Sequence, residues 1–96
     1  MKVLKTAVAG TMESSDIMVT VAPPEGNLIE IELNSLVEKQ FGDQIRESIL
    51  EILQKHDITS AKINAIDKGA LDCTIKARVE TAIYRACEVT DYIWKE

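Results

Sequence analysis

Two runs in the first third of the chain alternate between apolar and polar side chains. Residues 17–22 and residues 28–33 both follow a period of two, which is typical of a strand with one buried face. Residues 23–27 hold two prolines, a glycine and an asparagine, and so predict a turn between the runs. The pattern predicts an antiparallel hairpin, and a further strand is expected over residues 5–9.

A helical repeat follows the second run. Its apolar positions lie on one face of a helix: Val37, Phe41, Ile45, Ile49, Ile52 and Leu53. Ser35 followed by Glu38 fits a capping box at the start. Gly42 interrupts the repeat and Asp43 could cap a second segment, so we expect a kink or break there. Close packing is a better explanation of the glycine than a functional hinge. His56 closes the helix, where an imidazole suits the negative end of the helix dipole.

The last third of the chain has a less certain pattern. Residues 58–66 alternate well enough for a strand, and residues 67–69 predict a hairpin turn with glycine at positive φ. Residues 70–77 fit both a strand and a helix face. The flanking turn and the β-branched residues favour a strand there, followed by a helix through Ala86. A single long helix from Ala70 is the alternative.

These elements predict one α+β domain over residues 1–96. The preferred order is β-β-α-β-β-α, with the strand over residues 5–9 as a possible addition. We expect a two-layer sandwich in which an antiparallel sheet of four or five strands carries two helices on one face. A chain of 96 residues is the size of one domain.

Charge and cysteine usage exclude several classes of function. A net charge of −5 argues against binding to nucleic acid or to an anionic membrane surface. No apolar run approaches the ~20 residues of a membrane span. Cys73 and Cys87 lack a CxxC spacing and follow no export signal, so we expect a cytoplasmic protein with reduced thiols rather than a disulfide. Two cysteines and one histidine also fall short of the four ligands of structural zinc.

Residues 10–16 are the candidate functional segment. Ser14 and Ser15 lie between two acids in a polar tip directly before a strand. The single histidine, His56, lies far along the chain, so no base is placed to make either serine a nucleophile. The tip suits covalent modification more than catalysis. By residue type alone, however, a serine pair that hydrogen-bonds its own backbone is the favoured interpretation.

Three segments carry a resemblance to a known family. They are Ala7-Val8-Ala9-Gly10-Thr11 with Glu13-Ser14-Ser15-Asp16-Ile17-Met18 and Ala22-Pro23, then Val37-Glu38-Lys39-Gln40-Phe41-Gly42-Asp43, then Asp67-Lys68-Gly69-Ala70-Leu71-Asp72-Cys73. Together they resemble the acyl carrier protein (gamma chain) of citrate lyase, over nearly the whole chain to about Glu88. The resemblance implies an acyl carrier domain with no catalytic and no metal-binding residue of its own.

The resemblance also implies a covalent prosthetic group. By position in the family motif, Ser14 would carry 2'-(5''-phosphoribosyl)-3'-dephospho-coenzyme A through a phosphodiester. Nothing is carried over to Ser15. Glu13 and Asp16 would be recognised by the prosthetic-group transferase, or would simply form the turn.

The implied function is to hold acetyl and citryl thioesters while citrate is cleaved to acetate and oxaloacetate. The chemistry itself would belong to the citrate lyase alpha and beta chains, whose basic patches would meet the acidic surface of this chain. Two alternatives stay open. One is the analogous carrier of malonate decarboxylase, which uses the same prosthetic group. The other is a small adaptor module in which Ser14 is phosphorylated.

Overall fold

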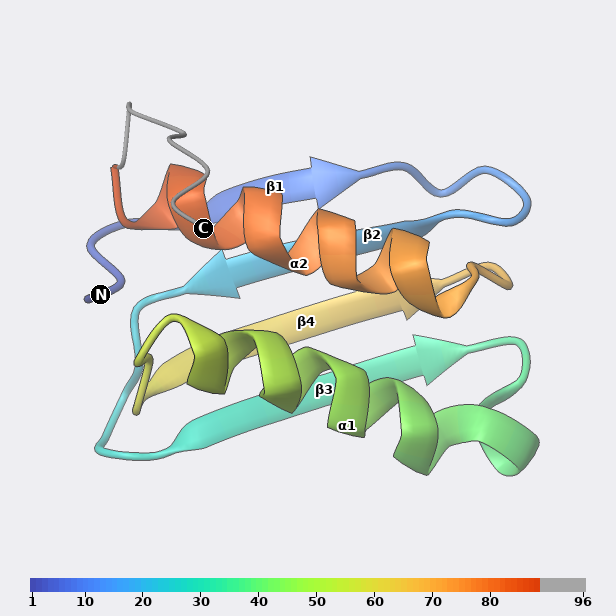
Figure 1. Cartoon of the computed structure of the whole chain (residues 1–96), viewed down its shortest axis with the longest axis horizontal. Helices are drawn as coiled ribbons and strands as arrows, with labels where there is room; N and C mark the ends of the chain where they lie inside the picture. Colours follow the sequence, from blue (N-terminus) through green and yellow to red (C-terminus); the bar gives the residue numbers. More distant parts are fainter. Residues whose placement is uncertain (89–96) are drawn as a thin grey trace.

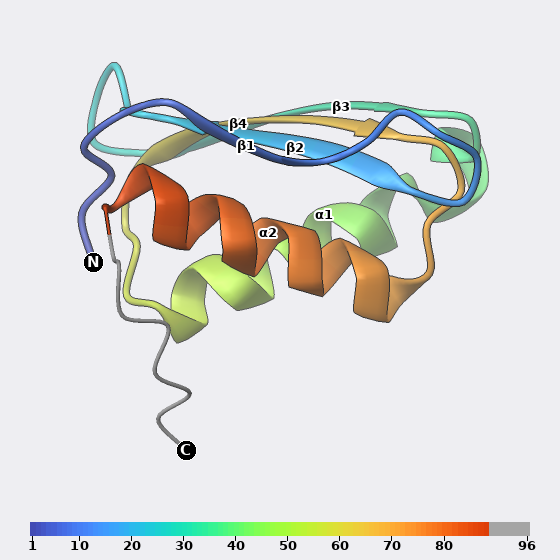
Figure 2. The same ribbon diagram turned by 90° about the horizontal axis from the view of Figure 1, so that it is seen from above.

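The part of the chain that the structure describes forms four strands and two helices. The computed structural model describes residues 1–88, which form β1 (Ala7–Gly10), β2 (Ile17–Ala22), β3 (Ile29–Ser35), α1 (Glu38–Lys55), β4 (Ala61–Asp67) and α2 (Asp72–Ala86). The strands form one sheet in the order β1-β2-β4-β3. Both helices lie against the same face of this sheet (Figure 1 and Figure 2). The predicted two-layer α+β sandwich with two helices on one face is therefore confirmed, as is the additional first strand.

The strand pairing corrects the predicted topology. β2 and β3 do not form a hairpin, because β4 lies between them, antiparallel to β2 and parallel to β3. α1 is the crossover between β3 and β4, so the sheet is mixed and not wholly antiparallel. Alternation shows which face of a strand is buried, but it carries no information on which strand lies beside it. The connection over residues 23–28 spans the gap that β4 fills.

The predicted strand over residues 70–77 was also wrong. Residues 72–77 belong to α2, close to the alternative of a single helix from Ala70, and the element order is β-β-β-α-β-α. The buried residues of α2 recur at helical spacing: Ile75, Val79, Ala82, Ile83, Tyr84 and Ala86. Cys73 and Ala77, which the strand pattern needed on the buried side, are exposed. The helical period therefore decides the structure because it is the one that buries the larger side chains.

The start of α1 differs from its prediction in two ways. α1 continues through Gly42, so the expected break does not occur. Gly42 is buried, and a Cβ there would lie 3.0 Å from Glu38 Cγ and 3.2 Å from Arg46 Nη1. Gly42 therefore packs closely against the side chains of Glu38 and Arg46 on the same helix. Ser35 does not form the capping box: it ends β3, and its hydroxyl accepts the Val37 N–H at 3.1 Å and donates to Asp67 at 2.8 Å.

The core lies between the sheet and the two helices. Its largest fully buried apolar side chains are Ile17, Val19, Val21, Ile49, Leu53, Ile63, Val79 and Ile83. α1 packs on β3, while α2 packs on β1 and β2 and also against α1. The predicted apolar face of α1 is confirmed from Ile45 onward, but Phe41 at its start is 48% exposed. The first turn of α1 therefore leaves apolar surface outside the core.

Candidate functional site

The connection between β1 and β2 holds the candidate segment. Gly10 ends β1 with a φ of +94°, and a Cβ there would lie only 1.9 Å from the Ile17 carbonyl oxygen. Only glycine fits so close to the backbone of the next strand. Ser15 also adopts a left-handed conformation, with φ of 65°. These positions turn the chain back sharply and leave residues 11–15 exposed at one end of the molecule.

Two backbone hydrogen bonds fix the far side of this loop to the connection between β4 and α2. The Ser15 N–H donates to the Lys68 carbonyl at 2.8 Å, and the Lys68 N–H donates to the Asp16 carbonyl at 2.9 Å. They continue the β2–β4 ladder, in which Ile17 faces Asp67, past the ends of the strands. Both connections lie at the same end of the molecule (Figure 1). The loop is therefore held by a segment more than fifty residues away in the sequence.

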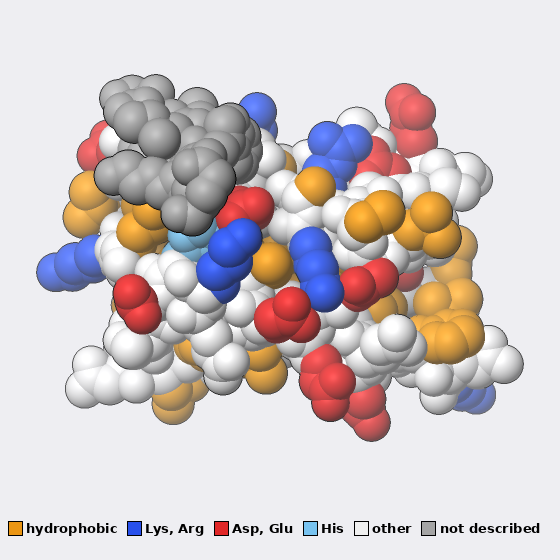
Figure 3. Space-filling model, viewed as in Figure 1, with side chains coloured by type: hydrophobic (Ala, Val, Ile, Leu, Met, Phe, Trp, Pro, Cys, Tyr) orange, Lys and Arg blue, Asp and Glu red, His pale blue; other side chains and the backbone are white. Residues whose placement is uncertain are grey.

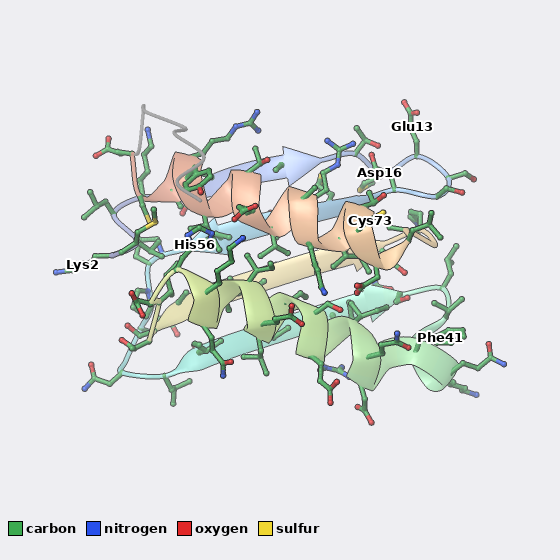
Figure 4. All side chains as sticks on the ribbon, viewed as in Figure 1. Lys2, Glu13, Asp16, Phe41, His56 and Cys73 are labelled. Atoms are coloured by element: carbon green, nitrogen blue, oxygen red, sulfur yellow. The ribbon has the colours of Figure 1, made fainter. Side chains whose placement is uncertain are left out.

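Asp16 joins the loop to α2. Its carboxylate accepts two hydrogen bonds from Arg78, Nε to Oδ1 at 3.1 Å and Nη2 to Oδ2 at 2.9 Å. The Thr11 hydroxyl donates to Oδ2 at 2.6 Å, and the Ile17 N–H donates to Oδ1 at 2.7 Å. Figure 4 shows Asp16 between the loop and α2, whereas Glu13 points outward. Asp16 is a turn former, one of the two roles expected for it.

These donors hold the pKa of Asp16 at about 2, below the ordinary 3.8. The Thr11 hydroxyl contributes most, followed by Arg78 and the Ile17 N–H, and all three favour the charged carboxylate. Because the pKa is depressed on folding, Asp16 stabilises the fold fully above the unfolded-state pKa. That contribution is lost as the pH falls from about 4 to about 2.

We expect Asp16→Asn to lower the free energy of unfolding at pH 7. The variant should also lose less of that free energy than the wild type when the pH is lowered below about 4. In urea unfolding at pH 5 to 7, the wild type should have the larger free energy of unfolding. This difference should narrow between about pH 4 and pH 2, where wild-type Asp16 also becomes neutral. Glu13→Gln is the matched control, because Glu13 forms no ion pair within residues 1–88. A difference in unfolding free energy that stays constant from pH 7 to pH 2 would mean that the Asp16 charge does not hold the loop.

Ser14 lies at the exposed tip of this anchored loop. Within the described residues, no group hydrogen-bonds to the hydroxyl of Ser14 or Ser15, so the interpretation of a pair bonded to its own backbone is not supported. The backbone on both sides of Ser14 is fixed, since the Glu13 carbonyl accepts the Asp16 N–H at 3.1 Å. An unpartnered hydroxyl on a fixed, exposed base fits the covalent attachment of a bulky group.

His56 lies at the other end of the molecule from this loop (Figure 4). It follows the last turn of α1, as predicted, and its Nε2 lies 2.6 Å from Glu80 Oε2. Its ring also meets the Tyr84 ring edge-on, with 5.2 Å between centroids. His56 therefore bridges α1 to α2 and takes no part in the candidate site.

The thiols and the remaining ligand types form no second site. Cys73 and Cys87 are free, and burial raises the pKa of the Cys87 thiol. They lie at opposite ends of α2, about 21 Å apart along the axis, too far for a disulfide. Among residues 1–88 no three His, Cys, Asp or Glu side chains are grouped to hold a metal ion. Nor is any helix in that range long and apolar enough to cross a membrane.

Arg78 and Lys68 are the residues of the site that the sequence did not indicate. Arg78 is 62 positions from Asp16, and nothing near either residue marks the pair. Arg78 does lie on the same helix as the buried positions Ile75 and Val79, which would direct it toward the sheet once α2 is known to be helical. The prediction of a strand over residues 70–77 weakened that signal, because it left Ile75 outside the helix that was predicted from Arg78 onward.

Comparison with known proteins places this chain beside acyl carrier proteins. Residues 4–86 match the family model described as malonate decarboxylase delta subunit (MdcD). The citrate lyase acyl carrier protein of Streptococcus mutans serotype c is 56% identical over 96 residues, which cover 100% of this chain and 94% of that protein. The citrate lyase acyl carrier protein of Streptococcus pyogenes serotype M4 is 53% identical with the same coverage.

The fold also occurs in a solved structure. A chain in the crystal structure of a Pseudomonas malonate decarboxylase hetero-tetramer in complex with malonate superposes with a TM-score of 0.75. The match covers 88% of this chain and 86% of that chain, at 17% sequence identity. The likeness confirms the α+β sandwich and, at this identity, supports nothing finer.

The fold and the family match together define an acyl carrier protein of the sheet-and-helix type. Such a protein carries a group and is not itself a catalyst, as the sequence predicted. The chain belongs to the citrate lyase acyl carrier protein family.

Proposed function

We propose that this chain is the acyl carrier subunit of a citrate lyase complex, with 2'-(5''-phosphoribosyl)-3'-dephospho-coenzyme A attached at Ser14. The observation that carries the proposal is the exposed Ser14 hydroxyl, which has no hydrogen-bond partner within residues 1–88 and stands on a loop anchored at both sides. When bound, the group supplies a thiol on which acetyl and citryl groups are held while citrate is cleaved to acetate and oxaloacetate.

The residues of this chain would position the attached group. Asp16 and Arg78 hold one side of the loop on α2, and Lys68 holds its backbone beside β4. A fixed base keeps the tethered group at high effective concentration near the active sites of the partner chains. Those partners would be the citrate lyase alpha and beta chains, and a dedicated transferase would recognise the loop. The free thiols of Cys73 and Cys87 support a reducing, cytoplasmic location.

Intact mass spectrometry tests the attachment. Protein made together with its transferase should carry the full mass of the phosphoribosyl-dephospho-coenzyme A group, and Ser14→Ala should abolish this increase completely. Ser15→Gly is the matched control: it removes the neighbouring hydroxyl, and glycine suits the φ of 65° at that position. We expect it to be modified like the wild type.

Three other outcomes contradict the proposal. An unmodified chain in an active complex would rule out a carrier role, and retention of the group in Ser14→Ala would move the attachment elsewhere. A single phosphate on Ser14 would instead support the adaptor alternative.

A second candidate function is the carrier of a malonate decarboxylase. The description of the matching family model and the shared fold favour it, whereas the sequence identity of 56% favours citrate lyase. Affinity purification of the loaded chain from its host separates the two. Recovery of citrate lyase alpha and beta chains supports our proposal, and recovery of decarboxylase subunits contradicts it.

A further inference from the structure

An apolar groove of about 320 Å³ lies between the start of α1 and the connection from β4 to α2. Its apolar walls are Val37, Phe41, Ile45, Ala70, Leu71 and Ile75. This volume lies at the lower end of the range for small-molecule sites, about 300 to 1,000 Å³. The groove is thus large enough for a slender ligand segment of a few functional groups.

The rim of this groove is apolar and faces solvent. Leu71 is 71% exposed and Phe41 is 48% exposed, although both lie next to buried core residues. Figure 3 shows hydrophobic side chains gathered at this end of the helical face, where α1 and α2 begin. Covering such side chains is favourable by about 25 cal/mol for each Å² of apolar area removed from water. The groove is therefore an apolar surface that a bound segment would cover.

Polar groups in the groove suit an amide-containing ligand. Gln44 and Asp72 line it beside the apolar walls. The Ser48 hydroxyl donates to Asp72, and Lys76 Nζ lies 3.2 Å from its carboxylate. These contacts lower the pKa of Asp72, the Ser48 hydrogen bond most of all, so a charged acceptor faces the groove at neutral pH. An amide N–H is the complementary donor.

The groove adjoins the loop that carries Ser14. Ser15 is hydrogen-bonded to Lys68 at 2.8 Å, and the next residue, Gly69, is part of the groove lining. Ser14 is therefore the neighbour of Ser15, the donor of this hydrogen bond, and Gly69 of the groove is the neighbour of Lys68, the acceptor. Two Cα steps and one strand-pair spacing put Ser14 within about 13 Å of the groove.

We propose that this groove binds the pantetheine end of the arm attached to Ser14. The inference rests on the attachment proposed above. Pantetheine combines methyl and methylene groups, which match the walls from Phe41 and Leu71, with two amides, which match Gln44 and Asp72. Because the arm is tethered beside the groove, a weak intrinsic affinity is enough for substantial occupancy. Docking there would shield the thiol from solvent between visits to partner active sites.

NMR of the loaded and unloaded protein tests this placement. Mass spectrometry first establishes that Ser14 is loaded; a sample that cannot be loaded overturns both the attachment and the groove proposal. In a loaded sample, we expect the amide signals of Phe41, Ala70 and Leu71 and the methyl signals of Ala70 and Leu71 to shift on loading. Leu28, which is 57% exposed on the connection from β2 to β3, should not shift. Shifts confined to the Ser14 loop would overturn the groove alone.

Thiol reactivity provides the second readout. In a background in which Cys73 and Cys87 are replaced by serine and alanine, the arm thiol is the only one left for iodoacetamide. Leu71→Asp should raise its alkylation rate by about threefold, the factor expected if the arm is docked for two thirds of the time. Aspartate also suits the start of α2, so the variant should fold. Leu28→Asp should leave the rate unchanged, and equal rates in all three proteins would overturn the proposal.

Discussion

Gly10→Ala should lower the free energy of unfolding by about 3 to 5 kcal/mol, summing steric strain and an unfavourable φ. The new Cβ would lie 1.9 Å from the Ile17 carbonyl oxygen, and the backbone φ there is +94°. The Ile17 backbone cannot easily withdraw, because its N–H is bonded to Asp16 and the residue is paired with Asp67 in the sheet. Urea unfolding monitored by circular dichroism measures the loss.

Gly69→Ala separates the two causes. Gly69 has nearly the same φ, +93°, but nothing lies within 4 Å of its Cβ position. This variant therefore carries the φ penalty alone, about 1 kcal/mol. If Gly10→Ala cost no more than Gly69→Ala, the approach of the two strands at Ile17 would not be as close as the structure has it.

Asp67→Ala should destabilise the protein by about 2 to 4 kcal/mol, because it leaves two hydrogen-bond donors without their acceptor. Asp67 is 1% exposed, and its carboxylate accepts the Ser35 hydroxyl at 2.8 Å and the Ala70 N–H at 2.9 Å. These bonds connect the end of β3 to the turn before α2. Thermal unfolding and urea unfolding both report the loss.

Asp43→Ala is the control for the loss of an acidic side chain. Asp43 is fully exposed on α1, and among residues 1–88 its one ion pair is with Arg46 at 3.8 Å, so its removal should change stability by less than about 0.5 kcal/mol.

The double variant Asp67→Ala with Ser35→Ala should lose less unfolding free energy than the sum of the two single losses. Both single changes remove the same hydrogen bond between Ser35 and Asp67. Additive losses would show that Ser35 and Asp67 do not interact in solution.

Local periodicity was enough to predict the faces of the strands but not their neighbours. The alternation of Ile17, Val19 and Val21 placed the buried side of β2 correctly. The insertion of β4 beside β2 depends on contacts forty or more residues apart, which no local pattern contains. The first part of α2 was misassigned for another reason: Cys73, Ile75 and Ala77 recur at every second position, as on the buried face of a strand. Only packing against β1 and β2 shows that Cys73 and Ala77 face solvent.

The candidate site, too, could be predicted from the sequence only in part. The exposure of Ser14 could be predicted from a polar tip between two strands, because such loops lie at the surface. The hydrogen bonds that fix the tip could not, since Lys68 and Arg78 reach Asp16 only after the chain has folded around them. The family resemblance predicted Ser14 as the attachment residue, and the structure adds how the backbone around Ser14 is held.

The two-sided anchoring of the loop has a geometric consequence for anything joined to Ser14. Because Arg78 binds the Asp16 carboxylate and Lys68 pairs with the loop backbone, the attachment point of a tether on Ser14 would be fixed relative to the domain. The volume that the far end could sweep would then be a dome centred on that point, with a radius set by the tether alone and its floor blocked by the domain. Any site served by the tether must lie inside that dome, or the domain itself must rotate to reach it.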